Sequence, residues 1–259
     1  MKKTYPWYDS VWLSNYVTVK DFIRENYPNK LKEFVDAFDP LQTRQDFEVI
    51  KLNDFLSPKI LEKLKSLIKE LEVEKQEVHE FMMFGRMVIH NHEYFNQLHD
   101  SITQTISDLV GEELHASYNF LSLYNNLGVC KVHMDAPLAK YTVDLCIEQS
   151  TDWKIFISQR KDWAEDFEWE GKGWQEKILK DPTNRFEPYS LSPGSGIIFS
   201  GSSQWHYRNR IFDYEQEENF CHLIFFHFTP KSMKEIVRCE NWANIFGIPE
   251  LNNLIRLDF

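Results

Sequence analysis

The sequence predicts an α+β fold that is mainly β, in which N-terminal helices pack on a β-barrel or sandwich. Two observations carry this prediction: before about residue 115 apolar residues recur at helical intervals, and after it short runs rich in β-forming residues follow one another. A third is the hydrophobic content of 42%, which with 20 Phe and 8 Trp in 259 residues supplies the apolar area of one sizeable core. We therefore expect one domain over residues 1–259, with a helical part at about 1–115 and a barrel at about 116–228.

Three helices are expected in the N-terminal part. The first covers residues 10–38, where Pro28 marks a break. The second begins after Ser57, a residue type that caps helix N-termini, with Pro58 at the first helical position. The third runs from about Tyr94 to Val110, because its apolar residues fall on one helical face.

The strands are expected as short apolar runs separated by turn residues. The last run is apolar on both faces and is therefore expected to be buried on both. A charged and aromatic segment at 159–188 interrupts the runs, and it is a candidate lid over the barrel mouth or an insertion packed on the outside. A short C-terminal helix is expected at about 231–250. The predicted strands are 47–52, 117–124, 129–135, 141–149, 153–158, 188–191, 197–200 and 219–228.

Charge and cysteine content limit the partners. The net charge of −11 disfavours a nucleic-acid binder, which needs a basic surface to neutralise phosphates. The N-terminus lacks the apolar core of a signal peptide, and no run approaches the roughly 18 apolar residues of a membrane span. The four cysteines form no Cys-x-x-Cys pair and are expected as free thiols in a reducing compartment. We expect a cytoplasmic protein without a nucleic-acid or membrane partner, and the sequence predicts no particular oligomeric state.

Two short sequences carry metal-binding chemistry. His133-Met134-Asp135 is followed by His206 after 206 − 133 = 73 residues. In a strand, residues i and i+2 point to the same side, so His133 and Asp135 can chelate one ion while Met134 faces away. His206 follows a glycine-bearing turn on another strand, and we expect it to reach the ion from across the barrel. Two imidazoles and one carboxylate suit Fe(II), and less specifically Mn(II) or Zn(II).

A His-x-Asp motif alone is weak, because a strand histidine bonded to a neighbouring carboxylate gives the same pattern. The surrounding landmarks are more specific, since they occur in a fixed order along about residues 48–228. They are Tyr124, Gly128, His133-x-Asp135, Pro193-Gly194, the apolar run Ile197-Ile198-Phe199, and His206.

In this order of landmarks the chain resembles the 2-oxoglutarate/Fe(II)-dependent oxygenases, particularly their prolyl-hydroxylase-like branch. The resemblance implies a double-stranded β-helix, a jelly-roll or cupin-like barrel, with Fe(II) bound by His133, Asp135 and His206. It also implies 2-oxoglutarate and O2 as cosubstrates. The expected reaction is hydroxylation of an unactivated C–H bond in a small molecule, an amino acid or a peptide.

One departure from the family pattern concerns the residue that holds the distal carboxylate of 2-oxoglutarate. The family usually places an arginine at the start of the last strand and a serine two residues later, where this chain has Phe220 and His222. A buried carboxylate still needs a charged or multi-donor partner. Arg208 is the leading candidate, because it lies two residues beyond His206 on the same strand face; a surface ion pair with the acidic 213–218 segment is the alternative. Further candidates are Arg210, Lys131, the hydroxyl of Tyr124, and His222 itself.

Other readings stay open. One is a cupin-type metalloenzyme that uses no 2-oxoglutarate, although cupins usually have His-x-His and a later Glu. Another is a non-catalytic barrel that acts as a binding module. His90-Asn91-His92 is expected to have a structural or substrate-contact role, and His227 should point opposite to His222 as a core or interface residue. The sequence has neither a phosphate-binding glycine loop nor the nucleophile elbow of a hydrolase.

Overall fold

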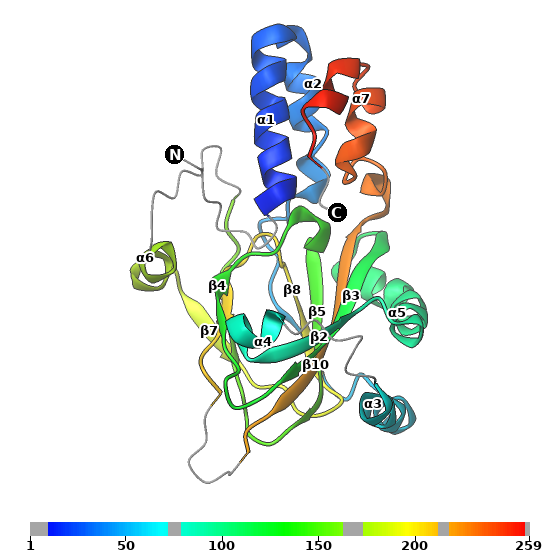
Figure 1. Ribbon diagram of the computed structural model, residues 1–259, viewed down its shortest axis with the longest axis vertical. Coiled ribbons are helices and arrows are strands. Elements are labelled where there is room, and N and C mark those ends of the chain that lie inside the picture. Colours follow the sequence, from blue (N-terminus) through cyan, green and yellow to red (C-terminus); the bar gives the residue numbers. More distant parts are fainter. Residues whose placement is uncertain (1–9, 72–78, 163–172, 212–217, 257–259) are drawn as a thin grey trace.

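The computed structural model describes residues 10–71, 79–162, 173–211 and 218–256, which form helices and two antiparallel sheets (Figure 1). The larger sheet has six strands in the order β1 (Ile50–Leu52), β8 (Gly196–Phe199), β5 (Tyr141–Gln149), β10 (Cys221–Pro230), β3 (Leu114–Tyr124) and β2 (Arg86–His90). The smaller has four in the order β4 (Cys130–His133), β9 (His206–Arg208), β6 (Ile155–Ser158) and β7 (Phe186–Tyr189). The predicted combination of N-terminal helices with a mainly β part after them is therefore confirmed, and the structure shows that the sheets are antiparallel.

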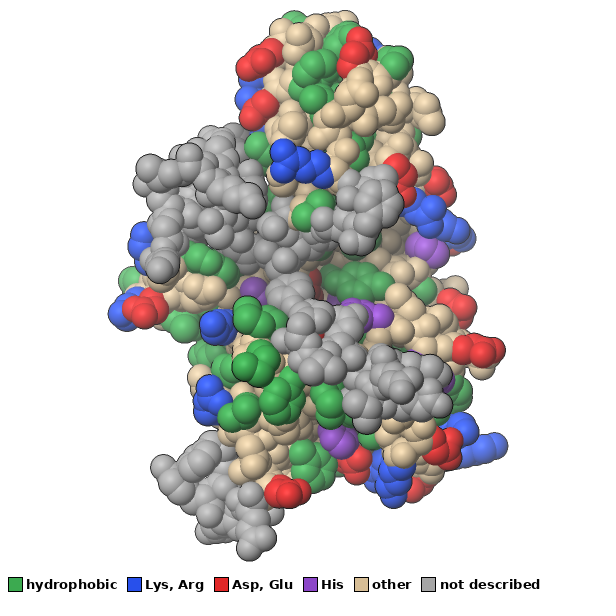
Figure 2. All heavy atoms as spheres, in the orientation of Figure 1, with side chains coloured by type: hydrophobic (Ala, Val, Ile, Leu, Met, Phe, Trp, Pro, Cys, Tyr) green, Lys and Arg blue, Asp and Glu red, His purple; other side chains and the backbone are tan. Residues whose placement is uncertain are grey.

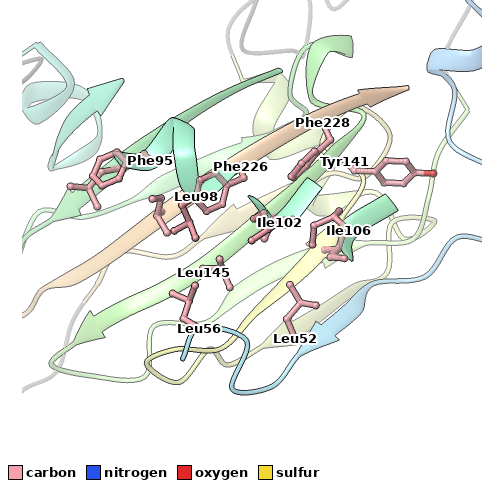
Figure 3. Packing of buried hydrophobic residues seen from close by; sticks show 14 of the residues in the cluster. Leu52, Leu56, Phe95, Leu98, Ile102, Ile106, Tyr141, Leu145, Phe226 and Phe228 are labelled. Carbon is pink, nitrogen blue, oxygen red and sulfur yellow. The ribbon is translucent and has the colours of Figure 1, made fainter. Parts of the chain in front are cut away.

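Helices α3 (Pro58–Glu70) and α5 (Glu93–Val110) cover the outer face of the larger sheet. Figure 3 shows Phe95, Leu98 and Ile102 of α5 directed at Phe226 and Phe228 of β10. All five side chains are buried, and this apolar face gives the amphipathic helix its place on the sheet. As predicted, the side chain of Ser57 caps α3, with its Oγ accepting from the N–H of Ile60 at 3.4 Å.

The inner face of the larger sheet looks towards the smaller sheet. A second apolar cluster occupies part of the space between them, with Leu223 and Phe199 on the larger sheet and Ile155 on the smaller. A buried ion pair also joins the sheets, between Arg208 Nη2 on β9 and Asp144 Oδ2 on β5 at 2.7 Å. The gap between the sheets holds a cavity of about 440 Å³.

A third cluster lies in a helical layer at one end of the strands (Figure 1). It is built by α1 (Ser10–Asn26), α2 (Leu31–Asp36) and α7 (Trp242–Ile245), with Pro28 breaking the first helix as predicted. Aromatic rings fill its centre: Trp12 and Trp242 meet edge-on with centroids 5.7 Å apart. The ring centroids of Phe34 and Phe246 lie 4.9 Å apart.

The C-terminal segment differs from the continuous helix expected at 231–250. It consists of 3-10 turns at Lys231–Met233, Cys239–Asn241 and Pro249–Asn253 around the four-residue α7. Extended backbone at Arg238 (ψ 106°) and left-handed backbone at Gly247 (φ 61°) interrupt the helix on either side of α7. Each interruption is local, so the helical periodicity of the apolar residues could not reveal it.

Neither α4 (His79–Phe84) nor β2 was predicted; β2 is the edge strand of the larger sheet and pairs with β3. Within the predicted 159–188 insertion, the structure describes α6 (Trp174–Lys180), which was not predicted, and the first three residues of β7. The aromatic residues at 163–172, which suggested a lid, lie outside the described residues.

The four cysteines are free thiols, and three of them are buried. Within the described ranges, no helix is both long and apolar enough to cross a membrane. On the face seen in Figure 2, acidic and basic side chains are interspersed over the described surface.

Candidate metal centre

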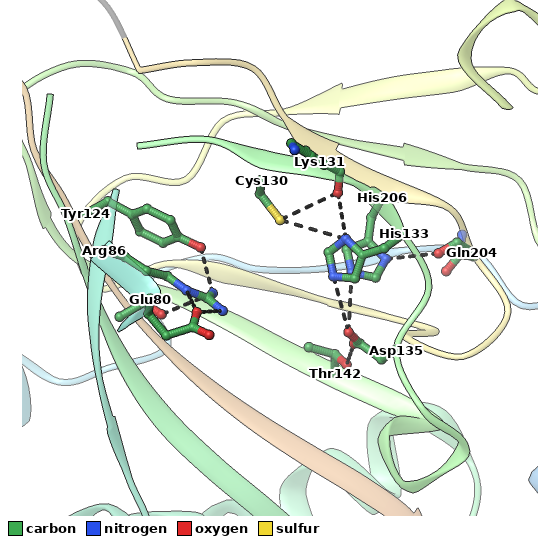
Figure 4. A network of polar contacts seen from close by, with 11 residues as sticks. Glu80, Arg86, Tyr124, Cys130, Lys131, His133, Asp135, Thr142, Gln204 and His206 are labelled. Atoms are coloured by element: carbon green, nitrogen blue, oxygen red, sulfur yellow. Dashed lines mark hydrogen bonds and ion pairs between the residues drawn. The ribbon is translucent and has the colours of Figure 1, made fainter. Parts of the chain in front are cut away.

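His133, Asp135 and His206 come together at one edge of the smaller sheet (Figure 4). Nε2 of His133 lies 3.5 Å from Oδ1 of Asp135, and Nε2 of His206 lies 3.6 Å from the same oxygen. The expectation that His206 reaches the ion from across the barrel is wrong: β9 is the immediate neighbour of β4, and His206 is the pairing partner of His133. Strand alternation behaves as predicted, because Met134 faces the apolar cluster of the helical layer.

Backbone and side-chain hydrogen bonds orient the three groups. Nδ1 of His133 donates to the carbonyl of Lys131 at 2.8 Å, and Nδ1 of His206 donates to the carbonyl of Gln204 at 3.0 Å. These bonds leave each Nε2 directed at Asp135. The other carboxylate oxygen of Asp135 accepts from Oγ1 of Thr142 at 3.0 Å. A metal-ligating histidine is commonly fixed in this way, with its second nitrogen bonded to a carbonyl.

Electrostatics at the site favour a cation. Burial alone would raise the pKa of Asp135, but the imidazoles of His206 and His133 hold it well below its usual range. Burial alone would lower the pKa of His133, but Cys130 and Asp135 raise it to about 10. The carboxylate is thus ionised and attracts positive charge, which a divalent ion can supply in place of the protons on nitrogen.

The donor set fits a divalent transition metal. An ion about 2.1 Å from each of three facial ligands needs ligand atoms about 3 Å apart. The two measured N···O distances, 3.5 and 3.6 Å, are slightly longer, and all three donor atoms lie within 4.8 Å of one another. His133, Asp135 and His206 would supply three ligands to a bound metal ion. Because all three residues line the cavity, further ligands could reach that ion from the cavity side.

A cluster of cationic and phenolic side chains lies at another part of the same cavity (Figure 4). Arg86 on β2 donates from Nη1 to the hydroxyl of Tyr124 at 2.9 Å, and its Nη2 lies 2.7 Å from Oε2 of Glu80. Burial raises the pKa of Tyr124 to about 12, so its hydroxyl stays protonated at neutral pH. Its O–H and the remaining N–H groups of Arg86 can therefore donate to an anion in the cavity.

Arg208 reaches the same region from the smaller sheet. It lines the cavity on the face predicted from its spacing to His206, and it is 2% exposed, so the alternative of a surface ion pair does not apply. Its guanidinium lies 5.0 Å from the ring centroid of Trp153, and that ring packs against Tyr124. With Asp144 bound to Nη2, Arg208 is already partly satisfied.

The other candidates for the carboxylate lie elsewhere. His222 is on the outer face of β10, where Nδ1 lies 2.9 Å from Oε1 of Glu148. Alternation along β10 instead turns Phe225 and His227 into the cavity, so His227 and His222 do point in opposite directions as predicted. Arg210 and Lys131 are exposed and do not line the cavity.

Sequence reasoning missed Arg86, Glu80 and the cavity position of His227. Arg86 lies 133 − 86 = 47 residues before the His-x-Asp motif, outside the part of the chain where the family pattern places a carboxylate partner. The available signal was the short run of β-forming residues at 86–90, whose alternation places Arg86, Val88 and His90 on one face.

No protein-family model matches the chain, and no curated protein is significantly similar to it. Solved structures do match. The non-haem α-ketoglutarate-dependent carbocyclase SnoK of nogalamycin biosynthesis is 12% identical, with a TM-score of 0.53 over 76% of this chain and 83% of that one. The epimerase SnoN of the same biosynthesis is 11% identical, with a TM-score of 0.52 over 77% and 84%.

HygX from Streptomyces hygroscopicus, solved with nickel, 2-oxoglutarate and hygromycin B, is 10% identical, with a TM-score of 0.50 over 77% of this chain and 87% of that one. At such low identity the similarity concerns the fold. The chain therefore has the fold of the 2-oxoglutarate-dependent non-haem iron oxygenases, as its sequence landmarks predicted.

Proposed function

We propose that this protein is a non-haem Fe(II)- and 2-oxoglutarate-dependent dioxygenase whose two sheets form a double-stranded β-helix. The observation that carries the proposal is the convergence of His133, Asp135 and His206 beside a cavity of about 440 Å³. These residues would hold the iron and leave its remaining positions turned to the cavity. With 2-oxoglutarate and O2, such an iron centre supplies the oxidising power to attack an unactivated C–H bond.

The distal carboxylate of 2-oxoglutarate would be held by Arg86 and Tyr124, with Arg208 contributing charge from the opposite sheet. Both guanidinium groups are already in ion pairs, Arg86 with Glu80 and Arg208 with Asp144. Arg86 is the better partner because its pair is the more accessible: its side chain and that of Glu80 are 11% and 8% exposed, against 2% and 0% for the other pair. A guanidinium and a phenol together give a carboxylate several donors in a site with little water. In this arrangement an arginine on β2 takes the place of the usual one on the last strand.

The remaining walls would exclude water and aim the substrate. They are largely apolar, with Phe84, Phe120 and Phe225 on the larger sheet's side, Ile155 on the smaller sheet, and Leu138 on the 3-10 turn Pro137–Ala139. The volume suits a small molecule or a single amino-acid side chain. Hydroxylation is the proposed outcome; SnoK and SnoN are a carbocyclase and an epimerase, so ring closure and epimerisation are the outcomes to test beside it.

The decisive experiment is anaerobic. Fe(II) and 2-oxoglutarate are added to the purified protein, and the weak visible charge-transfer band of the chelated cosubstrate is recorded. We expect the band in the wild type and its loss in His133→Ala. His222→Ala is the matched control, because that imidazole lies outside the cavity and the band should persist.

Two outcomes separate the alternatives. Metal binding without the band would favour a cupin-type enzyme that uses no 2-oxoglutarate, and no metal binding at all would favour a binding module. The anchor is tested with Arg86→Gln, which should weaken 2-oxoglutarate binding about 30-fold or more, the effect of leaving a buried charge pair incomplete. Wild-type affinity in Arg86→Gln would refute the anchor and leave the dioxygenase assignment intact.

A further inference from the structure

Five side chains form what we call the aromatic wall of the cavity: His90 on β2, Tyr118 and Phe120 on β3, and Phe225 and His227 on β10. The rings pair across neighbouring strands. Tyr118 and His227 stack with centroids 4.0 Å apart and planes 8° apart, and Phe120 and Phe225 stack at 4.9 Å and 29°. The proposed carboxylate anchor uses none of them.

The aromatic wall extends away from Arg86 and Tyr124, the proposed carboxylate-binding residues. On β3, Tyr118 precedes Tyr124 by 124 − 118 = 6 residues, which spans about 20 Å of extended chain. On β2, His90 lies at the opposite end of the strand from Arg86. One end of the cavity is therefore suited to an anion, and the other end presents aromatic surface to a second molecule.

His227 is the polar exception in this surface, and its orientation is fixed. Its Nδ1 donates to the carbonyl of Tyr118 at 3.2 Å, and the stacked ring of Tyr118 prevents the imidazole from turning over. Burial lowers the pKa of His227 to about 4, so the ring is neutral at pH 7. A neutral imidazole that donates from Nδ1 can only accept at Nε2.

His227 lines the same cavity as the three proposed metal ligands. The carboxylate of Asp135 and the imidazole of His206 both act electrostatically on His227, as does His90 from the wall itself. Among the described residues, no hydrogen bond to Nε2 of His227 is found. An acceptor held rigidly in an apolar wall favours a ligand that brings a donor to it.

We propose that His227 positions the substrate by accepting a hydrogen bond at Nε2, so that the site selects small, largely apolar molecules carrying a hydroxyl or N–H group. This inference rests on the proposed function, because it assigns the aromatic wall to the substrate of that reaction. A site built around a hydrogen bond discriminates strongly against an analogue that lacks the donor, whereas apolar walls discriminate weakly between analogues of similar size.

The first test measures the tautomer. Full-length protein labelled with ¹⁵N-histidine is studied by NMR between pH 6 and pH 8, and the His227 signals are assigned by their loss in His227→Phe. We expect a protonated Nδ1 and an unprotonated Nε2 throughout this range. A proton on Nε2 would overturn the proposal.

The second test uses phenol and toluene, which have nearly the same shape but differ in the donor. Their dissociation constants are measured by ligand-observed NMR, in one series with Zn(II) and in another with EDTA. In His227→Phe the affinity for phenol relative to toluene should fall about tenfold, the effect of one hydrogen bond. The matched control is His99→Leu, which removes a buried imidazole from the outer side of β10 and should leave the ratio unchanged.

An unchanged ratio in His227→Phe, an equal change in His99→Leu, or no binding of either probe would overturn the proposal. The EDTA series requires neither iron nor 2-oxoglutarate. A missing charge-transfer band would therefore sink the proposed function while this measurement still decided the role of His227.

Discussion

Gly201 lies directly against the proposed carboxylate ligand, which makes Gly201→Ala a sharp test of the site. A Cβ at this position would lie 2.3 Å from Oδ2 of Asp135, 2.5 Å from Oγ1 of Thr142 and 2.6 Å from the carbonyl oxygen of Ala139. Ordinary carbon–oxygen contacts are about 3.5 Å. The carboxylate would have to move by about 1 Å, and its hydrogen bond to Thr142 would be lost or bent.

The expected effect on metal affinity follows from that displacement. The substitution moves one of the three proposed ligands and disturbs the hydrogen bond that orients it, and such changes lower metal affinity about 10- to 100-fold. This loss corresponds to about 1.4 to 2.7 kcal/mol. The added methyl group should also destabilise the metal-free fold by about 1 to 3 kcal/mol, the usual effect of overpacking.

The assay is calorimetric titration with Mn(II), alongside urea unfolding in the presence of EDTA. Gly196→Ala is the matched control, because its Cβ would be as crowded, 2.2 Å from the carbonyl oxygen of Asp144, but it lies on β8 away from the three ligands. Both variants should lose stability, and only Gly201→Ala should lose metal affinity. Wild-type affinity in Gly201→Ala, or an equal loss in Gly196→Ala, would refute the reasoning.

Three further predictions concern hydrogen bonding, pH and helix capping. Thr142→Val keeps the side-chain shape but removes the donor to Asp135, and Mn(II) affinity should fall about tenfold in calorimetry; an unchanged affinity would mean that this bond does not orient the ligand. Burial lowers the pKa of His99 from 6.5 to about 3, so the unfolded chain binds a proton that the folded chain does not, and stability is lost as pH falls from 6.5 towards 3. Between pH 7 and pH 5 this proton lowers the free energy of unfolding of the wild type by about 2 kcal/mol. In urea unfolding with EDTA present, the free energy of unfolding of His99→Leu should therefore fall by about 2 kcal/mol less over the same range. Equal falls in the two proteins would contradict the prediction. Ser57→Ala removes the cap of α3 and should lower the free energy of unfolding by about 1 kcal/mol at pH 7, while Lys59→Ala on the same exposed turn should change it by less than about 0.5 kcal/mol.

The convergence of the proposed metal ligands was predictable because local geometry determines most of their arrangement. Alternation along one strand places His133 and Asp135 together, and the same rule places Arg208 on the cavity face shared with His206. Strand neighbours are not a local property, and for this reason His206 was expected from across the barrel although it is paired with His133. The residue types alone indicated a metal-binding site, but the pairing of β4 with β9 could be seen only in the folded structure.

The proposed carboxylate partner, Arg86, was harder to predict because its position depends on the register of two paired strands. Arg86 meets Tyr124 only because β2 pairs with β3 so that these two residues lie opposite each other. A five-residue strand at the edge of a sheet has too few residues for a clear periodic signal, and it is stabilised by its neighbour. His222 failed as a candidate for a related reason, since aligning the last strand by its apolar run did not reveal which of its faces lines the cavity.

The bonds from the two histidines to backbone carbonyls have a consequence for how such a site tolerates sequence change. The carbonyls of Lys131 and Gln204 would be present whatever side chains these positions carried, provided that the strands kept their course. The orientation of each imidazole ring is thus determined by the backbone, and the exposed side chain of Lys131 is not needed for it. Very few side chains would therefore need to be kept for the three proposed ligands to converge.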